Sequence, residues 1–100
     1  MATIEFEWDE EKAKTNLKKH RISFPVAARV FADPHALTIQ DRIEDGEYRW
    51  QTLGLVNGQV VVMVAHTSRF DENDAEVVRI ISARRAEQKE RKRYEQNRSS

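Results

Sequence analysis

The dipeptide Asn57-Gly58 constrains the fold most strongly, because it stands between two strand-like apolar runs, residues 49–55 and 59–67. A two-residue hairpin turn favours the type I′ geometry, in which both turn residues take positive φ, and Asn-Gly adopts it readily. The two runs are therefore predicted to pair as antiparallel strands. A hairpin in the middle of a 100-residue chain indicates one domain built around a sheet.

Further strand patterns flank this hairpin on both sides. Residues 4–8 alternate apolar and acidic side chains with a period of two, which is typical of a strand with one buried face. Two more strands are predicted at residues 36–40 and 76–82, with polar turns at residues 44–46 and 71–74. The sheet is thus predicted to be a mostly antiparallel meander.

The period of two also divides the side chains of each strand between two faces. Arg79 is expected on the face opposite Val78 and Ile80, and Arg49 on the face opposite Trp50. An arginine in the middle of a strand is ordinary on the solvent side of an antiparallel sheet. The alternative is a functional surface on which the arginines converge.

Three helices are predicted from capping residues and charge placement. Asp9 can cap a helix that begins with acids and ends with bases, as the helix dipole favours. Its thin apolar stripe is Ala13 and Leu17, which His20 can extend. Ser23 can cap a short second helix, and a basic third helix follows the last strand at residues 86–94. The order indicates an α+β fold with helices over one sheet face and the other face open.

Composition limits the class of protein. With 39% hydrophobic and 34% charged residues, the chain is expected to form a single soluble domain over residues 1–96, followed by a disordered tail at residues 97–100. Its longest apolar run, residues 60–65, is far shorter than the roughly 20 residues that span a bilayer. The N-terminus is acidic and lacks a signal-peptide pattern, so a cytoplasmic protein without membrane association is expected.

The charges are segregated along the chain although its formal net charge is zero. Residues 79–98 hold eight basic and three acidic residues, whereas residues 71–76 hold four acids and no base. Such separation suggests a surface that faces phosphate groups. The alternative is a solvated helix stabilised by ion pairs four residues apart, such as Glu87 with Arg91.

Blocks of residues along nearly the whole chain carry a resemblance to a known family. In chain order they are residues 6–13 (FEWDEEKA), Asn16, Leu17, Lys19, His20, Ser23, Phe24, Ala27, Ala28, residues 30–34 (VFADP), Glu47, Arg49, Trp50, Leu53, Gly54, residues 60–64 (VVVMV), residues 79–84 (RIISAR), Glu90, Arg91 and Tyr94. Together these blocks resemble the BrnT family, the toxin half of type II toxin–antitoxin pairs. Arg21 departs from the pattern, because the family usually has the glycine expected at a helix C-terminus.

The resemblance implies a RelE-like fold and a ribonuclease activity that inhibits translation and growth. It further implies neutralisation by a BrnA-type antitoxin that also binds the DNA of the operon. The toxin itself would contact DNA only indirectly, through that antitoxin.

The side chains can be matched to the steps of RNA cleavage. Attack by the 2′-OH needs a base, cations that stabilise the crowded phosphorane and an acid for the 5′-oxygen. Arg49, Arg79 and Arg84 are the candidates for the cationic task, since arginine is always charged and its fork matches phosphate oxygens. His20 and Glu47 are the candidates for proton transfer.

Each of these assignments has a structural alternative. His20 also suits a helix C-terminus as a dipole-stabilising cation, Glu47 can be a cross-strand ion partner, and Trp50 can belong to the core. If Trp50 is accessible it can stack on a base. The candidates for RNA binding are Lys19, Trp50, Arg69 and Arg85.

Other chemistries have little support in the sequence. With no cysteine there is no disulfide, thiolate metal site or cysteine nucleophile. The three histidines, His20, His35 and His66, form no pair with metal-ligand spacing, so no metal and no cofactor is expected. A non-enzymatic module that grips nucleic acid or a protein through the basic helix and open sheet remains the competing class. Such a binder needs spread charge, whereas a nuclease needs arginines that converge beside a proton-transfer group.

Overall fold

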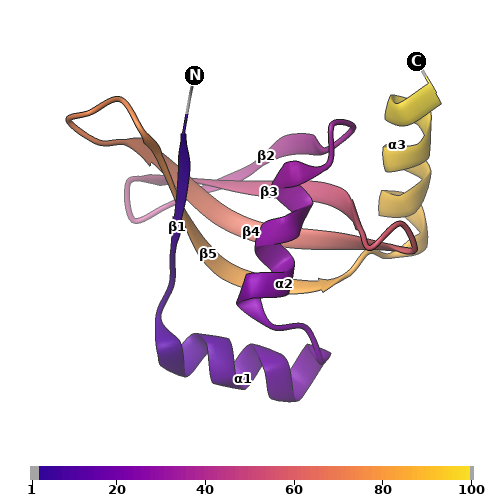
Figure 1. The fold of residues 1–100 in the computed structure, drawn as a ribbon, viewed down its shortest axis with the longest axis horizontal. Helices are drawn as coiled ribbons and strands as arrows, with labels where there is room; N and C mark the ends of the chain where they lie inside the picture. The colour runs from indigo at the N-terminus through magenta and orange to yellow at the C-terminus, as the bar shows by residue number, and fades with distance from the viewer. Residues whose placement is uncertain (1–2, 100) are drawn as a thin grey trace.

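The computed structural model describes residues 3–99 and shows an α+β fold with one five-stranded sheet and helices on both of its faces (Figure 1). Within these residues, no helix is both long and apolar enough to cross a bilayer. The strand order across the sheet is β1-β5-β4-β3-β2, and only the β1–β5 pair is parallel. The elements are β1 (Ile4–Glu7), α1 (Glu10–His20), α2 (Phe24–Ala28), the 3₁₀ helix η1 (Arg29–Ala32), β2 (Leu37–Glu44), β3 (Glu47–Val56), β4 (Val60–Phe70), β5 (Glu76–Arg85) and α3 (Gln88–Ser99).

The central hairpin forms as predicted. Asn57 and Gly58 have φ of 55° and 69°, and Val56 pairs with Val60 across them. The strands run further than the sequence predicts, since β4 continues to Phe70 and β5 to Arg85. These two strands pair along almost their whole lengths, so ladder hydrogen bonds hold polar residues that have little strand preference of their own.

Helix α1 begins at the predicted cap, where the Asp9 carboxylate accepts hydrogen bonds from two backbone N–H groups of the first turn. The helix ends at Arg21, which takes the left-handed conformation with φ of 62° and donates its N–H to the Leu17 carbonyl. This left-handed position favours glycine, which the family pattern has here, but in this chain it is occupied by arginine. The non-glycine residue costs about 1 kcal/mol there.

The predicted apolar stripe of α1 is wrong at Leu17, whose side chain is 47% exposed. The buried residue of this helix is Asn16, whose amide nitrogen donates to the Ala83 carbonyl at 2.9 Å and whose oxygen accepts from the Ala83 N–H at 3.0 Å. Strand β1 ends opposite Arg79, so β5 has no strand partner at Ala83 on that side. The Asn16 side chain supplies the missing ladder bonds, which is why a polar residue occupies the buried position.

The main core lies between the sheet and helices α1 and α2. Phe24, Ala27 and Val30 are fully buried against β4 and β5. Helix η1 approaches β3 so closely that a Cβ on Gly54 would lie 2.6 Å from Val30 Cγ1 and 2.8 Å from its carbonyl oxygen. Glycine is therefore required at position 54 by packing, and not by its backbone angles.

Helix α3 packs on the opposite face of the sheet, so the expectation that all helices cover one face is wrong. Ala86 and Tyr94 form a second core cluster there with Leu53, Val61 and Met63. Helix α3 also runs to Ser99, so residues 97–99 continue the helix in place of the predicted tail, whose last residue, Ser100, lies outside the described residues. Only the end of this face near α3 is covered, and its other end carries the predicted arginines.

Candidate active site on the arginine face

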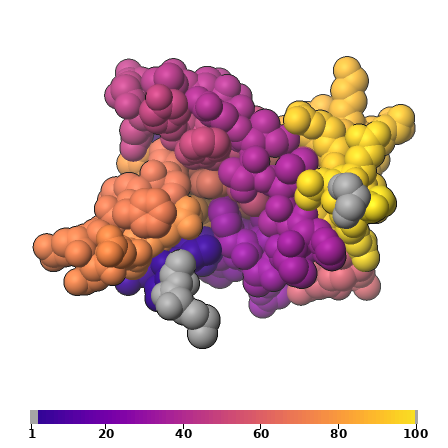
Figure 2. Space-filling model, turned by 90° about the horizontal axis from the view of Figure 1, so that it is seen from above, coloured from indigo at the N-terminus to yellow at the C-terminus, as the bar shows by residue number. Residues whose placement is uncertain are grey.

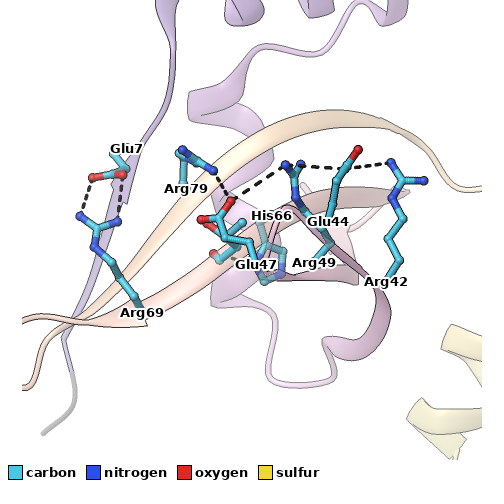
Figure 3. A network of polar contacts seen from close by, with 9 residues as sticks. Glu7, Arg42, Glu44, Glu47, Arg49, His66, Arg69 and Arg79 are labelled. Atoms are coloured by element: carbon cyan, nitrogen blue, oxygen red, sulfur yellow. Dashed lines mark hydrogen bonds and ion pairs between the residues drawn. The ribbon is translucent and has the colours of Figure 1, made fainter.

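Alternation along four strands places five charged side chains on the part of the sheet face that α3 leaves open. They are Glu7 from β1, Glu47 and Arg49 from β3, Arg69 from β4 and Arg79 from β5, and we call this surface the arginine face (Figure 3). Arg79 is registered opposite Glu7 on one side and Thr67 on the other. Residues distant in sequence thus meet because their strands are neighbours in the sheet.

Glu47 stands between two arginines at the centre of this face. Its Oε1 accepts a hydrogen bond from Arg79 Nη2 at 2.9 Å and lies 4.0 Å from Arg49 Nη2. Glu44 lies 3.7 Å from Arg49 and 3.4 Å from Arg42, which extends the network along the β2–β3 hairpin (Figure 3). Three arginines and two glutamates leave an excess of one positive charge in this network.

Arg49 is the least satisfied of these arginines. Its side chain is 20% exposed, its two ion-pair distances are long, and its Nε is buried without a hydrogen-bond partner among residues 3–99. A buried donor without a partner is uncommon in native proteins and costs about 1–3 kcal/mol. The free protein therefore holds a guanidinium whose hydrogen-bonding capacity is only partly used by its own side chains.

Arg69 is already paired at the edge of the arginine face. It donates two hydrogen bonds to Glu7, at 3.0 and 3.2 Å, and these bonds lower the pKa of Glu7 and raise the pKa of Arg69. Both side chains are exposed, so the pair is screened by water and contributes little to stability. A phosphate group can compete for this arginine at small cost.

Arg84 has a different environment from the other predicted arginines. It is registered opposite Met63, near α3, and binds Glu90 through two hydrogen bonds at 2.9 and 3.0 Å. This pairing raises the pKa of Arg84 and lowers the pKa of Glu90, whose Oε1 also accepts the Glu87 N–H. The contacts join the end of β5 to the first turn of α3, so Arg84 has a structural role.

The structure does not bring His20 to the arginine face. His20 and Lys19 line a hollow of about 330 Å³ between α1 and β5, together with Ser82. Arg85 is exposed and lines an adjoining hollow of about 180 Å³ with His20. Among residues 3–99, no hydrogen bond or ion pair joins His20 to Glu47, so these two predicted proton-transfer groups are separate.

Trp50 lies on the other face of the sheet from Arg49, as the alternation predicts. It is half-buried and lines a cavity of about 410 Å³, which we call the aromatic pocket. No local sequence pattern groups the other members of this pocket, because they come from four separate elements. They are Phe31, Thr38, His66, Ser68, Phe70 and Glu76.

His66 forms part of the pocket wall and is itself 3% exposed. Its Nδ1 lies 3.2 Å from the Thr67 carbonyl, which can only accept, so Nδ1 carries the hydrogen. Its Nε2 then accepts from the Thr52 hydroxyl at 2.7 Å, and Thr38 in turn donates to Thr52 at 2.8 Å. Burial lowers the pKa of His66 and keeps the ring neutral.

Comparisons with known proteins agree with this architecture. The chain is similar to the ribonuclease toxin BrnT of Brucella abortus, whose 1.1 Å crystal structure matches with a TM-score of 0.64 and 24% identity over 87% of this chain and 100% of that chain. No curated protein matches the sequence. The model of the family described as "Ribonuclease toxin, BrnT, of type II toxin-antitoxin system" matches residues 8–90. With more than half of its length matched, the chain belongs to the BrnT family of ribonuclease toxins.

Proposed function

We propose that this chain is an endoribonuclease toxin that cleaves RNA on the arginine face without a metal ion. The observation that carries the proposal is the position of Glu47 between Arg79 and Arg49 on the part of the sheet face that α3 leaves open. A carboxylate can accept a proton, and two fixed guanidiniums beside it can hold a phosphate. A module that only binds RNA has no need for a carboxylate that neutralises its central arginines.

The mechanism follows from this geometry. A phosphodiester displaces Glu47 from Arg79 and takes hydrogen bonds from Arg79 and Arg49, which stabilise the charge of the phosphorane. Glu47 accepts the proton of the 2′-OH as its oxygen attacks phosphorus, and the bond to the 5′-oxygen breaks. The leaving oxygen takes its proton from water on this open face, and the product carries a 2′,3′-cyclic phosphate.

The remaining candidates take supporting roles in the proposal. Arg69 binds a neighbouring phosphate, since its exposed pair with Glu7 exchanges easily. Arg84 positions the junction of β5 and α3 and does not contact the reacting atoms. Lys19, Arg85 and His20 lie at the α1 end of the sheet, where they extend the path of the RNA backbone.

The partner is proposed to be a BrnA-type antitoxin, and any contact with DNA runs through that antitoxin. The family to which the chain belongs is defined by a type II toxin–antitoxin system, in which the antitoxin is a protein. The compartment proposed for the pair is the cytoplasm, where its RNA substrate is found.

The test is cleavage of single-stranded RNA by purified protein in the presence of EDTA. The expected products are fragments ending in 2′,3′-cyclic phosphate. Glu47→Gln is expected to lower the cleavage rate at least about 100-fold, because general base catalysis contributes that much. Loss of cleavage in EDTA with recovery on adding a divalent ion contradicts the metal-free mechanism. RNA that is bound but left intact favours the binding module.

A further inference from the structure

The aromatic pocket lies on the sheet face opposite the arginine face and has no role in the proposed cleavage. It is bounded by β2 and β3 on one side and by β4 and β5 on the other. Both hairpins end on the side of the molecule away from α3, as the magenta and orange segments show (Figures 1 and 2). Its volume of about 410 Å³ falls within the range of small-molecule sites.

The walls of the pocket suit a flat aromatic ligand. Trp50, Phe70 and Phe31 supply three ring systems, and Phe31 packs edge-on against His66 with ring centroids 4.9 Å apart. Phe70 is 68% exposed, so its ring is available to a ligand. Every nucleobase has a π-face, and stacking of a base on an aromatic side chain is worth about 1–3 kcal/mol.

Glu76 is the charged group of the pocket, and among residues 3–99 no cation lines it. Ser68 donates its hydroxyl hydrogen to Glu76 Oε2 at 2.5 Å, whereas Glu76 Oε1 accepts no hydrogen bond from residues 3–99. Within the described residues neither lysine nor arginine lines the pocket, and burial of His66 lowers its pKa and favours the neutral ring. A phosphate therefore finds no cation to bind in this pocket, whereas a neutral ring with N–H donors on its edge can hydrogen-bond to Glu76.

Among the four RNA bases, guanine fits these acceptors best. Its Watson–Crick edge presents two adjacent donors, N1–H and N2–H, which match one carboxylate. Adenine, cytosine and uracil each place an acceptor beside their donor, and that acceptor would face the carboxylate. We propose that the aromatic pocket binds a guanine base of the RNA, with the ring stacked on Trp50 and its edge paired with Glu76; this rests on the proposed ribonuclease function.

An apolar protein anchor is the competing occupant, because Ile43 and Tyr48 near the pocket are 57% and 56% exposed. Exposed apolar side chains of this size often mark protein interfaces. An aliphatic or aromatic anchor would, however, remove water from Glu76 without supplying a donor. Burying a carboxylate without a partner is costly, so the floor of the pocket favours a base.

The test is to bind mononucleotides to the protein and to measure the binding by tryptophan fluorescence. The chain has two tryptophans, so Trp8→Phe leaves Trp50 as the sole reporter. Guanosine monophosphate is expected to quench Trp50 and to bind at least about tenfold more tightly than the adenosine, cytidine and uridine monophosphates, the ratio of one bidentate pair. Calorimetry on the unsubstituted protein gives the same ratio without the Trp8 change.

Two matched variants locate the preference. Glu76→Gln replaces one acceptor with a donor and is expected to abolish the guanine preference, while the oxygen of glutamine still accepts from Ser68. Glu72→Gln, in the exposed turn nearby, is expected to keep it. Equal affinity for all four nucleotides, or a preference that survives Glu76→Gln, overturns the inference.

The result of this binding test does not depend on the result of the cleavage test, because binding is measured without cleavage. A protein that cuts RNA in EDTA but leaves Trp50 unquenched by guanosine monophosphate retains the proposed function and loses this inference. Quenching of Trp50 by the antitoxin alone, with no effect of any nucleotide, assigns the pocket to protein docking and also overturns it.

Discussion

At the scale of single residues, Arg79 offers the cleanest separation of activity from stability. Its side chain is 41% exposed and its ion pair with Glu47 is reached by water, so Arg79→Ala is expected to change the free energy of unfolding by no more than about 1 kcal/mol. The same change removes a donor to the phosphorane and is expected to lower the cleavage rate about 100-fold or more. Cleavage assays and growth after induced expression measure the loss.

Arg98→Ala is the matched control for Arg79→Ala, since Arg98 is an exposed arginine near the end of α3. It is expected to leave cleavage and growth arrest unchanged. If both variants arrest growth equally well, the arginine face is not the site of cleavage.

His66 gives a residue-scale prediction about pH. Because burial lowers its pKa, the folded protein keeps this ring neutral, while the unfolded chain takes up a proton below about pH 6.5. The unfolded state therefore binds more protons, and the free energy of unfolding is expected to fall as the pH drops from 7 towards 5. Denaturant titrations at several pH values measure this slope.

Two histidine variants test the source of the slope. His66→Gln is expected to lower stability at pH 7, because the glutamine packs less well against Phe31, and to flatten the slope between pH 7 and 5. His35→Gln, at an exposed position, is expected to keep it. A slope that persists in His66→Gln assigns the pH dependence to other groups.

At the scale of elements, the Tyr94 side chain anchors the middle of α3. The Tyr94 hydroxyl donates to Asp33 Oδ2 at 2.5 Å, and the same oxygen accepts the Leu55 N–H at 2.7 Å. Burial, with the neighbouring Asp33 carboxylate, raises the pKa of Tyr94 to about 12. Burial also acts to raise the pKa of Asp33, but the hydrogen bonds that it accepts outweigh this and hold the pKa below its ordinary value. The contact fixes α3 to the loop after η1.

Tyr94→Phe is therefore expected to destabilise the protein by about 1.5–3 kcal/mol, the value of a hydrogen bond to a charged group. It is also expected to speed hydrogen exchange in α3 more than in α1. Tyr48→Phe is the control, since Tyr48 is 56% exposed and makes no hydrogen bond through its side chain within residues 3–99. Equal exchange rates in α3 with and without the Tyr94 hydroxyl contradict the anchoring role.

The elements show which features a sequence can predict. The Asn57-Gly58 turn and the Asp9 and Ser23 caps are local signals, and all of them are confirmed. Asn16 was missed because its partner, Ala83, is 67 residues away, and a buried amide in a helix has no periodic signature. The anchoring of α3 was missed for the same reason, since Tyr94 meets a carboxylate 61 residues away.

In the candidate site, too, the local features were predictable from the sequence and the long-range contacts were not. Alternation predicted on which side of their own strands Arg49 and Arg79 lie, but not that Glu47 lies between them, since strand register depends on the whole sheet. The aromatic pocket was hidden because its residues come from η1, β2, β3, β4 and β5. No short motif in the chain records such a convergence.

At the scale of the whole molecule, the arginine face and α3 lie on the same side of the sheet, and both carry basic side chains. Residues 79–98 hold eight bases and three acids, and Lys89, Lys92 and Arg93 of α3 are exposed. An antitoxin with acidic or hydrogen-bonding groups is expected to bind here and cover Arg79 and Arg84, because complementary charge guides such docking. Inhibition then comes from occlusion of the RNA path and leaves the toxin folded.

Hydrogen exchange on the free and complexed toxin measures this occlusion. Binding is expected to slow exchange across residues 79–94, whereas amides of α1, on the other side of the sheet, are expected to change little. RNA and antitoxin are expected to compete, so Arg79→Ala weakens both. Unchanged protection at residues 79–94 on complex formation would show that the antitoxin inhibits from another surface.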